Sequence, residues 1–130
     1  MIFTSIKRSN IRYYNISDFK KYIFKENRLT IKILSKANEE IIKQIREVEI
    51  ICKDYDKTTG SICIDASLNF YPEIKTLFLL YEDNKLISLI SIFIPTASEA
   101  EISAYTLPEY RQKGYFRELL DEVIEELKKY

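Results

Sequence analysis

The chain has 130 residues, 46% of them hydrophobic and 31% charged, which indicates one folded domain over residues 1–130 rather than a disordered segment. Twenty Lys and Arg residues balance 20 Asp and Glu residues, so no cationic excess favours nucleic acid as a partner. The absence of histidine excludes Ser-His and Cys-His nucleophiles, and the lack of any apolar run of signal-peptide or membrane-span length predicts a cytoplasmic protein with no membrane partner.

The first 28 residues mix aromatic and charged side chains and are expected to form an N-terminal extension of the domain. Ser17 and Asp18 are placed to cap a short helix in this extension. Its apolar side chains would share one face: Phe19, Tyr22 and Ile23.

A strand and a helix are predicted next. The alternating residues 29–34 (LTIKIL) are typical of a strand, and Asn38, which two glutamates follow, begins a helical pattern. An apolar stripe with i, i+4, i+7 and i+11 spacing would face the core: Ile41, Ile45, Val48 and Cys52.

The segment after this helix is expected to be mostly irregular. Residues 53–61 are polar and predict a surface loop, and residues 62–73 are expected to hold a short helical turn that Pro72 ends. Cys52 and Cys63 are too few and too far apart for a metal site or a redox pair, so we expect buried free thiols and no metal.

A β-hairpin is the clearest local prediction. Residues 76–81 (TLFLLY) are typical of a buried strand, Asp83 and Asn84 predict a tight turn, and residues 85–94 (KLISLISIFI) predict the partner strand, which Pro95 ends. The second strand is apolar on both faces, so we expect it to be central and covered by helices on each side.

The alternating residues 99–106 predict one more strand, and a helix is expected from Gly114 to the last residue. Pro108 stops the strand, and a polar bend separates it from the helix. One face of the strand carries polar groups: Glu99, Glu101, Ser103 and Tyr105. Charged side chains are expected on the solvated face of the helix: Glu118, Asp121, Glu122, Glu125, Glu126, Lys128 and Lys129.

The bend between this strand and helix has the features of an anion site. The start of a helix exposes backbone N–H groups and the positive end of the helix dipole, which together favour a phosphate. Gly114 would let a phosphate approach the backbone closely, because it has no Cβ. Arg111, Lys113 and Arg117 add positive charge.

The sequence TLPEYRQKGYF of this bend resembles the coenzyme-A-binding signature of the GCN5-related N-acetyltransferases, Arg/Gln-x-x-Gly-x-Gly/Ala. Arg111 and Gly114 match the signature, and Phe116 stands where the family has Gly or Ala. The order of predicted elements in residues 29–130 is similar to the N-terminal and central parts of that family. The resemblance implies an α/β (α+β) fold, a mixed, mostly antiparallel sheet with helices on both faces that ends after the third core helix and lacks the family's C-terminal part.

The resemblance also implies a cofactor, acetyl-coenzyme A, and a reaction, acetyl transfer to a primary amine of a small molecule or peptide. The pantetheine arm would pair with the backbone of Thr106 and Leu107, and Arg111 would lie beside the pyrophosphate. The pyrophosphate would bind the N–H groups of the helix start: Gln112, Lys113, Gly114, Tyr115, Phe116 and Arg117.

Direct attack by an amine needs no enzyme nucleophile, but it needs a base, because a lysine-like amine with a pKa near ~10.4 is protonated at neutral pH. Glu101 is the first candidate, since the family's histone-modifying members carry their base carboxylate at this place, and we expect partial burial to raise its pKa. Its alternative role is that of a solvated strand carboxylate. Tyr105, on the same face, is the second catalytic candidate and could instead only line the cleft.

Two other functions compete with catalysis. The chain could be a non-catalytic coenzyme-A-binding or interaction module, with a homodimer or strand exchange formed across residues 99–107, because the strand at 99–106 would be an edge of the sheet. It could also be a structural fold without ligand, if its own side chains block the helix start.

Overall fold

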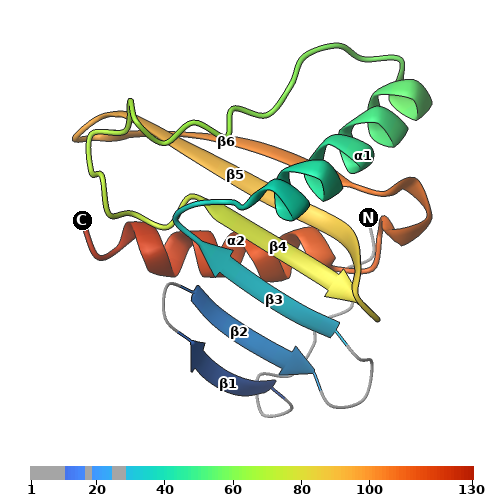
Figure 1. Ribbon diagram of the computed structural model, residues 1–130, viewed down its shortest axis with the longest axis horizontal. Coiled ribbons are helices and arrows are strands. Elements are labelled where there is room, and N and C mark those ends of the chain that lie inside the picture. The colour runs from blue at the N-terminus through green and yellow to red at the C-terminus, as the bar shows by residue number, and fades with distance from the viewer. Residues whose placement is uncertain (1–10, 17–18, 25–28) are drawn as a thin grey trace.

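The computed structural model describes residues 11–16, 19–24 and 29–130, and its strands form one sheet (Figure 1). In these residues six strands lie in the order β1-β2-β3-β4-β5-β6. Their bounds are Ile11–Ile16 (β1), Phe19–Phe24 (β2), Leu29–Leu34 (β3), Leu77–Glu82 (β4), Lys85–Thr96 (β5) and Glu99–Thr106 (β6). All five pairings are antiparallel, which confirms the predicted α/β class with a mostly antiparallel sheet.

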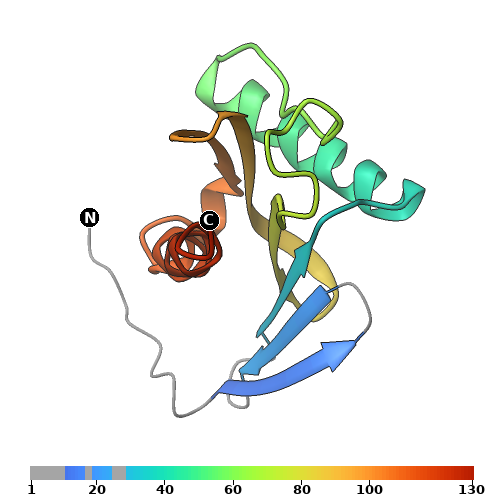
Figure 2. The ribbon, with the colours of Figure 1, turned by 90° about the vertical axis from the view of Figure 1, so that its left-hand side faces the viewer.

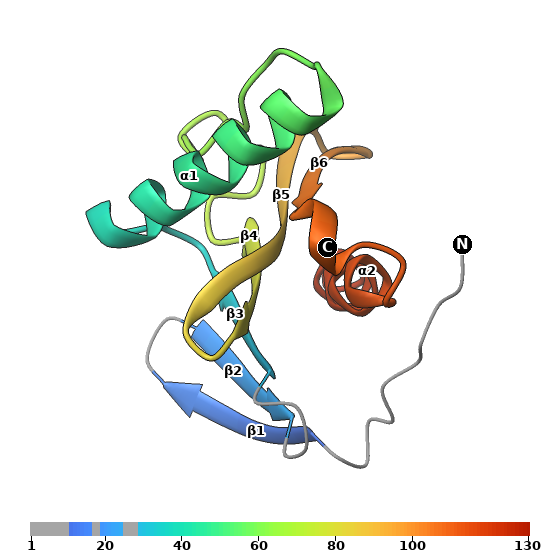
Figure 3. The same cartoon turned by 90° about the vertical axis from the view of Figure 1, so that its right-hand side faces the viewer.

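Two α-helices cover opposite faces of the sheet, as predicted (Figure 2 and Figure 3). Helix α1 (Glu39–Asp56) lies on one face and α2 (Tyr115–Leu127) on the other, and a short 3₁₀ helix (Pro108–Tyr110) precedes α2. Helix α1 begins after Asn38 as expected, and Asn38 caps it, because its Oδ1 accepts a hydrogen bond of 2.9 Å from the Ile41 N–H. Between the helices, β5 is buried over residues 86–92, which explains why that strand is apolar on both faces.

The predicted helix of the N-terminal extension is wrong. Residues 19–24 form β2, which pairs with β1 on one side and with β3 on the other, where Phe19 lies opposite Leu34 and Phe24 opposite Leu29. Pairing along a whole strand of the sheet outweighs a weak local helix signal. Ser17 and Asp18, the predicted cap, lie outside the described residues.

The hairpin of β4 and β5 is confirmed, with one difference at its end. Asp83 and Asn84 both have positive φ, 47° and 70°, as a two-residue hairpin turn requires. Pro95 was expected to end the second strand, but β5 continues to Thr96. The register of the pairing shifts between Phe93 and Thr96, and such an irregularity accommodates a residue that has no N–H to donate.

Residues 62–73, between α1 and β4, form no helix, and the expected helical turn is limited to single hydrogen-bonded turns. The Asn69 N–H donates to the Ala66 carbonyl (3.1 Å), and the Ile74 N–H donates to the Tyr71 carbonyl (3.3 Å). Long-range hydrogen bonds also hold the segment. The Ile62 N–H donates to the carboxylate of Glu49 (2.6 Å), and the Asn69 Oδ1 accepts from the Ile94 N–H (2.8 Å). Contacts of this kind join residues far apart in the sequence, so no local pattern indicates them.

Two polar residues lie elsewhere than expected. Helix α2 ends at Leu127, and Glu126 is buried rather than solvated, because its carboxylate accepts from the Lys75 N–H (3.1 Å) and from Lys129 Nζ (2.9 Å). Cys52 is a buried free thiol as predicted, whereas Cys63 lies in the irregular segment and is exposed.

Candidate functional site

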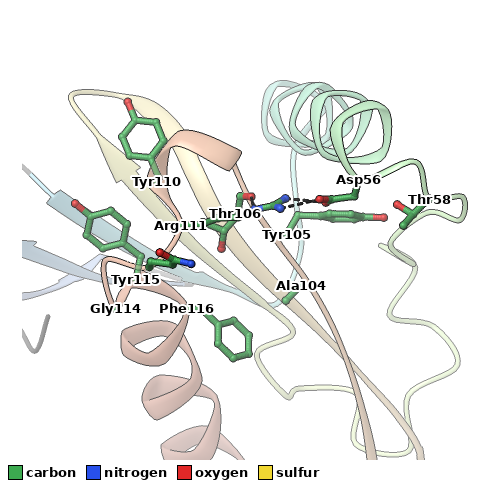
Figure 4. Close-up of a pocket in the computed structure, with 11 residues that line it drawn as sticks. Asp56, Thr58, Ala104, Tyr105, Thr106, Tyr110, Arg111, Gly114, Tyr115 and Phe116 are labelled. Carbon is green, nitrogen blue, oxygen red and sulfur yellow. Dashed lines mark hydrogen bonds and ion pairs between the residues drawn. The ribbon is translucent and has the colours of Figure 1, made fainter. Parts of the chain in front are cut away.

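A pocket of about 470 Å³ opens where β6 ends, between the start of α2 and the end of α1 (Figure 4). It lies at the edge of the sheet and so receives side chains from both faces. Its lining residues are Asp56, Thr58, Ala104, Tyr105, Thr106, Tyr110, Arg111, Gln112, Gly114, Tyr115 and Phe116. The structure therefore brings most of the predicted coenzyme-A-binding residues together with Tyr105.

The start of α2 forms one wall of this pocket. Gly114 is the N-cap residue with φ 82°, a left-handed conformation that favours glycine, and Tyr115 and Phe116 follow it along the wall. The Gly114 carbonyl accepts the first helical hydrogen bond, from the Glu118 N–H (3.1 Å). Glycine has no side chain with which to cap the first-turn N–H groups. The geometry expected of an anion site is thus present next to an open pocket.

Arg111 is held by contacts within the protein. Its Nη1 and Nη2 donate to the two carboxylate oxygens of Asp56 at 2.7 and 2.8 Å, and its Nε donates to the Thr106 carbonyl at 2.9 Å (Figure 4). The guanidinium also lies 5.5 Å from the ring centre of Tyr55. The bend is therefore tied to the last residue of α1 and to the end of β6.

Three of the backbone groups expected to pair with pantetheine are already engaged: the Thr106 carbonyl and both groups of Leu107. The Thr106 carbonyl accepts from Arg111 and also from the Cys52 thiol (3.4 Å). The Leu107 N–H donates to the Ile87 carbonyl (2.9 Å), and the Leu107 carbonyl accepts from the Tyr110 N–H (2.9 Å). A ligand would have to break these bonds to pair with the Thr106 carbonyl or with Leu107. The Thr106 N–H is different: because the Leu107 N–H points to β5, the N–H of the preceding residue points away from β5.

The register of the sheet points to other backbone groups on β6. The Ile92 N–H donates to the Thr76 carbonyl on the β4 side (2.9 Å). The backbone groups of the preceding residue of β5, Ser91, therefore point to the other side, toward β6, where Ser91 pairs with Ser103. Backbone direction alternates along a strand, so the N–H and C=O groups of Ile102 and Ala104 face away from β5. They lie along the edge of β6 that leads to the pocket.

The ion pair gives the pocket its charge distribution. Hydrogen bonds from the Arg111 guanidinium lower the pKa of the Asp56 carboxyl, and the same bonds raise the pKa of Arg111, so both groups are charged at neutral pH. Burial raises the pKa of Tyr105, and the nearby Glu49, Cys52 and Asp56 raise it further. Tyr105 therefore keeps its proton at neutral pH.

Four of the predicted site residues lie outside the pocket. Leu107 is buried, while Lys113 and Arg117 are exposed, with the Lys113 ammonium 5.5 Å from the ring centre of Tyr110. Glu101 is exposed on β6 opposite Phe93, so the partial burial expected to raise its pKa is not observed.

Asp56, Thr58, Ala104 and Tyr110 line the pocket but were not singled out in the sequence. Only Asp56 carries a sequence signal. Asp56 is the last residue of α1, where a carboxylate interacts unfavourably with the helix dipole. A carboxylate at such a position indicates that a cationic group lies nearby and offsets this interaction.

Within residues 29–130, side chains of His, Cys, Asp and Glu form no group of three that could hold a metal ion. The described helices include none with the length and apolar character needed to span a membrane.

Residues 42–130, well over half of the chain, match the acetyltransferase (GNAT) family. No curated protein matches the chain. The matched residues include most of α1, all of β4, β5 and β6, the bend and α2, and therefore every residue that lines the pocket. The match confirms the resemblance of the bend to the GCN5-related N-acetyltransferases, and it supports an acetyltransferase-type function in general. The chain belongs to the acetyltransferase (GNAT) family.

Proposed function

We propose that this protein transfers an acetyl group from acetyl-coenzyme A to a primary amine of a small molecule or peptide. The observation that carries the proposal is the open pocket of about 470 Å³ against the start of α2, where Gly114, Tyr115 and Phe116 form the wall. The pyrophosphate would accept hydrogen bonds from the first-turn N–H groups. Family membership supports the same donor.

The pantetheine arm would run along β6. It carries amide groups, and the backbone of Ala104 and Ile102 faces the edge of the sheet, so the arm would pair there as a short strand does. We infer this in place of the expected pairing with the Thr106 carbonyl and with Leu107, whose groups are engaged, whereas the Thr106 N–H faces the same edge as Ala104. The thioester would then lie beside the middle of β6.

The reaction needs a base and an acid. The neutral amine attacks the thioester carbonyl, the C–N bond forms and the C–S bond breaks. The nitrogen releases one proton as the amide forms, and the coenzyme A thiolate accepts one from an acid, which the released proton restores. Glu101, exposed on β6, would accept the proton of the substrate ammonium. Tyr105 lines the pocket and keeps its proton at neutral pH, so it is suited to protonate the thiolate.

Phe116→Glu tests the coenzyme A site. It places a carboxylate in the pocket wall on a residue that is 38% exposed, without the backbone strain that Gly114→Glu would add at φ 82°. We expect the Kd of acetyl-coenzyme A, measured by calorimetry, to rise by about tenfold or more, because an added anion repels the pyrophosphate.

Ile124→Glu is the matched control, because it adds the same carboxylate to an exposed apolar position of α2 outside the pocket. It should bind acetyl-coenzyme A within about twofold of the wild type. Absence of binding by the wild type, or equal weakening by both variants, would contradict the proposal.

A second candidate function is self-association through β6. Within the described residues β6 pairs only with β5, and its Ile102 side chain is 45% exposed. Because Arg111 and Cys52 occupy the Thr106 carbonyl, a second strand would pair with the part of β6 before Thr106.

Sedimentation tests this association. We expect a dimer at roughly tens of micromolar protein and a monomer for Ile102→Lys, because a charge on an edge strand opposes pairing. A wild-type chain that stays monomeric at that concentration argues against a dimer.

A further inference from the structure

The ion pair of Asp56 and Arg111 joins residues 55 positions apart, with both side chains about one-third exposed at the pocket. Three hydrogen bonds of 2.7 to 2.9 Å fix the guanidinium against Asp56 and the Thr106 carbonyl. This bidentate geometry leaves Arg111 a poor candidate for a direct phosphate ligand, since its charge is neutralised by a carboxylate already in the pocket.

Two neighbouring features are unfavourable on their own. Asp56 is the last residue of α1, where a carboxylate opposes the helix dipole. Gln112 has φ 63°, a left-handed conformation that is strained for a residue with a Cβ. Strain of this kind persists only where the surroundings hold the backbone in place. Arg111, held by its three hydrogen bonds, is the residue directly before Gln112.

We propose that Asp56 is a positioning residue of the coenzyme A site: by holding Arg111, it keeps Gln112 in its left-handed conformation and so aims the N–H groups at the start of α2 into the pocket. The inference rests on the proposed function of this pocket. Asp56 acts through Arg111 and does not touch the ligand itself.

The geometry links the ion pair to the helix start in short steps. Arg111 is fixed on one side of Gln112, and Gly114, with φ 82°, follows two residues later as the N-cap of α2. When Asp56 no longer holds Arg111, Gln112 can relax to negative φ, and the relaxed bend moves Gly114 and the first turn. The donors would then no longer converge on one anion.

Asp56→Asn is the first test, with Asp54→Asn as its matched control. Asp54 lies in the same last turn and pairs with Lys57 at 3.9 Å, but both side chains are more than four-fifths exposed. We expect Asp56→Asn to raise the Kd of coenzyme A about tenfold and Asp54→Asn to leave it within about twofold, both by calorimetry.

Gln112→Gly separates positioning from a general structural role. Glycine adopts positive φ without strain, so the double variant Asp56→Asn/Gln112→Gly should bind coenzyme A within about threefold of Gln112→Gly alone. Gln112→Ala removes the same side chain but keeps the Cβ, so Asp56→Asn/Gln112→Ala should stay about tenfold weaker than Gln112→Ala. Arg111→Lys, which can keep only part of the contacts, provides a second perturbation of the same link.

The outcomes separate the two proposals. A wild-type chain that does not bind coenzyme A overturns the proposed function and this inference with it. If the wild type binds coenzyme A and Asp56→Asn binds it equally tightly, the inference alone is overturned, because holding Arg111 would then not affect binding. Tighter binding by Asp56→Asn also overturns it, because Arg111 would then be a phosphate ligand that Asp56 holds back. Equal behaviour of the Gln112→Gly and Gln112→Ala double variants also overturns it. If Asp56→Asn does not fold, Arg111→Lys takes its place. The affinity of Arg111→Lys for coenzyme A is then compared with that of the wild type, and the affinity of Arg111→Lys/Gln112→Gly with that of Gln112→Gly.

Discussion

Replacing Glu49 with alanine is expected to lower the free energy of unfolding by about 3 kcal/mol. Glu49 is 2% exposed, and its carboxylate accepts two hydrogen bonds from Arg46 (2.7 and 2.9 Å) and one from the Ile62 N–H (2.6 Å). Alanine would leave the Ile62 N–H buried without a partner. Chemical denaturation monitored by circular dichroism measures the loss.

The same variant should loosen the segment between α1 and β4. The contact with Ile62 ties this segment to α1, and Thr58, near its start, lines the pocket. We expect faster proteolysis within residues 57–73 in Glu49→Ala. Glu47 is exposed and lies two residues before Glu49 on the same helix. As a control, Glu47→Ala should change the free energy of unfolding by no more than about 0.5 kcal/mol. Equal stability of the two variants would contradict the role assigned to Glu49.

Replacing Gly114 with alanine is expected to lower the free energy of unfolding by about 1–2 kcal/mol and to weaken coenzyme A binding. At φ 82° an alanine Cβ strains the backbone, and relief of that strain would shift the start of α2 against the pocket. Thermal unfolding and calorimetry measure the two effects.

Gly60→Ala is the matched control, because it adds backbone strain at a position outside the coenzyme A site. Gly60 also has positive φ, 104°, but a Cβ there would meet no atom within 4 Å, and the residue lies outside the pocket. We expect a comparable loss of stability, about 1 kcal/mol, with unchanged affinity for coenzyme A. Equal affinities of Gly114→Ala and the wild type would show that the helix start does not set binding.

Local sequence patterns were sufficient to predict those features that depend only on residues close together in the chain. The alternation of β3 and β6, the turn at Asp83 and Asn84, and the helix start at Asn38 were all predicted, because each depends on neighbours within a few residues. The bend from Arg111 to Gly114 was also found from its sequence, because the motif lies between a strand and a helix.

Local patterns failed where distant segments decide. The helix signal before Phe19 was outweighed by pairing along β2, and Glu126 appeared solvated although the Lys75 N–H, far away in the sequence, requires its carboxylate. In the site, the charges of Arg111, Lys113 and Arg117 suggested three similar ligands for an anion. The structure gives Arg111 a partner, Asp56, and leaves Lys113 and Arg117 outside the pocket.

The sequence by itself determined the four strands and two α-helices of residues 29–130, the family, and the placement of the candidate anion site at the start of α2. These follow from the period of apolar residues and from the chemistry of a glycine at a helix start. Only the tertiary structure decided that Arg111 is paired with Asp56, that the Thr106 carbonyl and the Leu107 backbone are engaged, and that Glu101 is exposed. The physical reason is that hydrogen-bond partners and burial depend on contacts between segments far apart in the sequence. A local sequence pattern does not indicate those contacts.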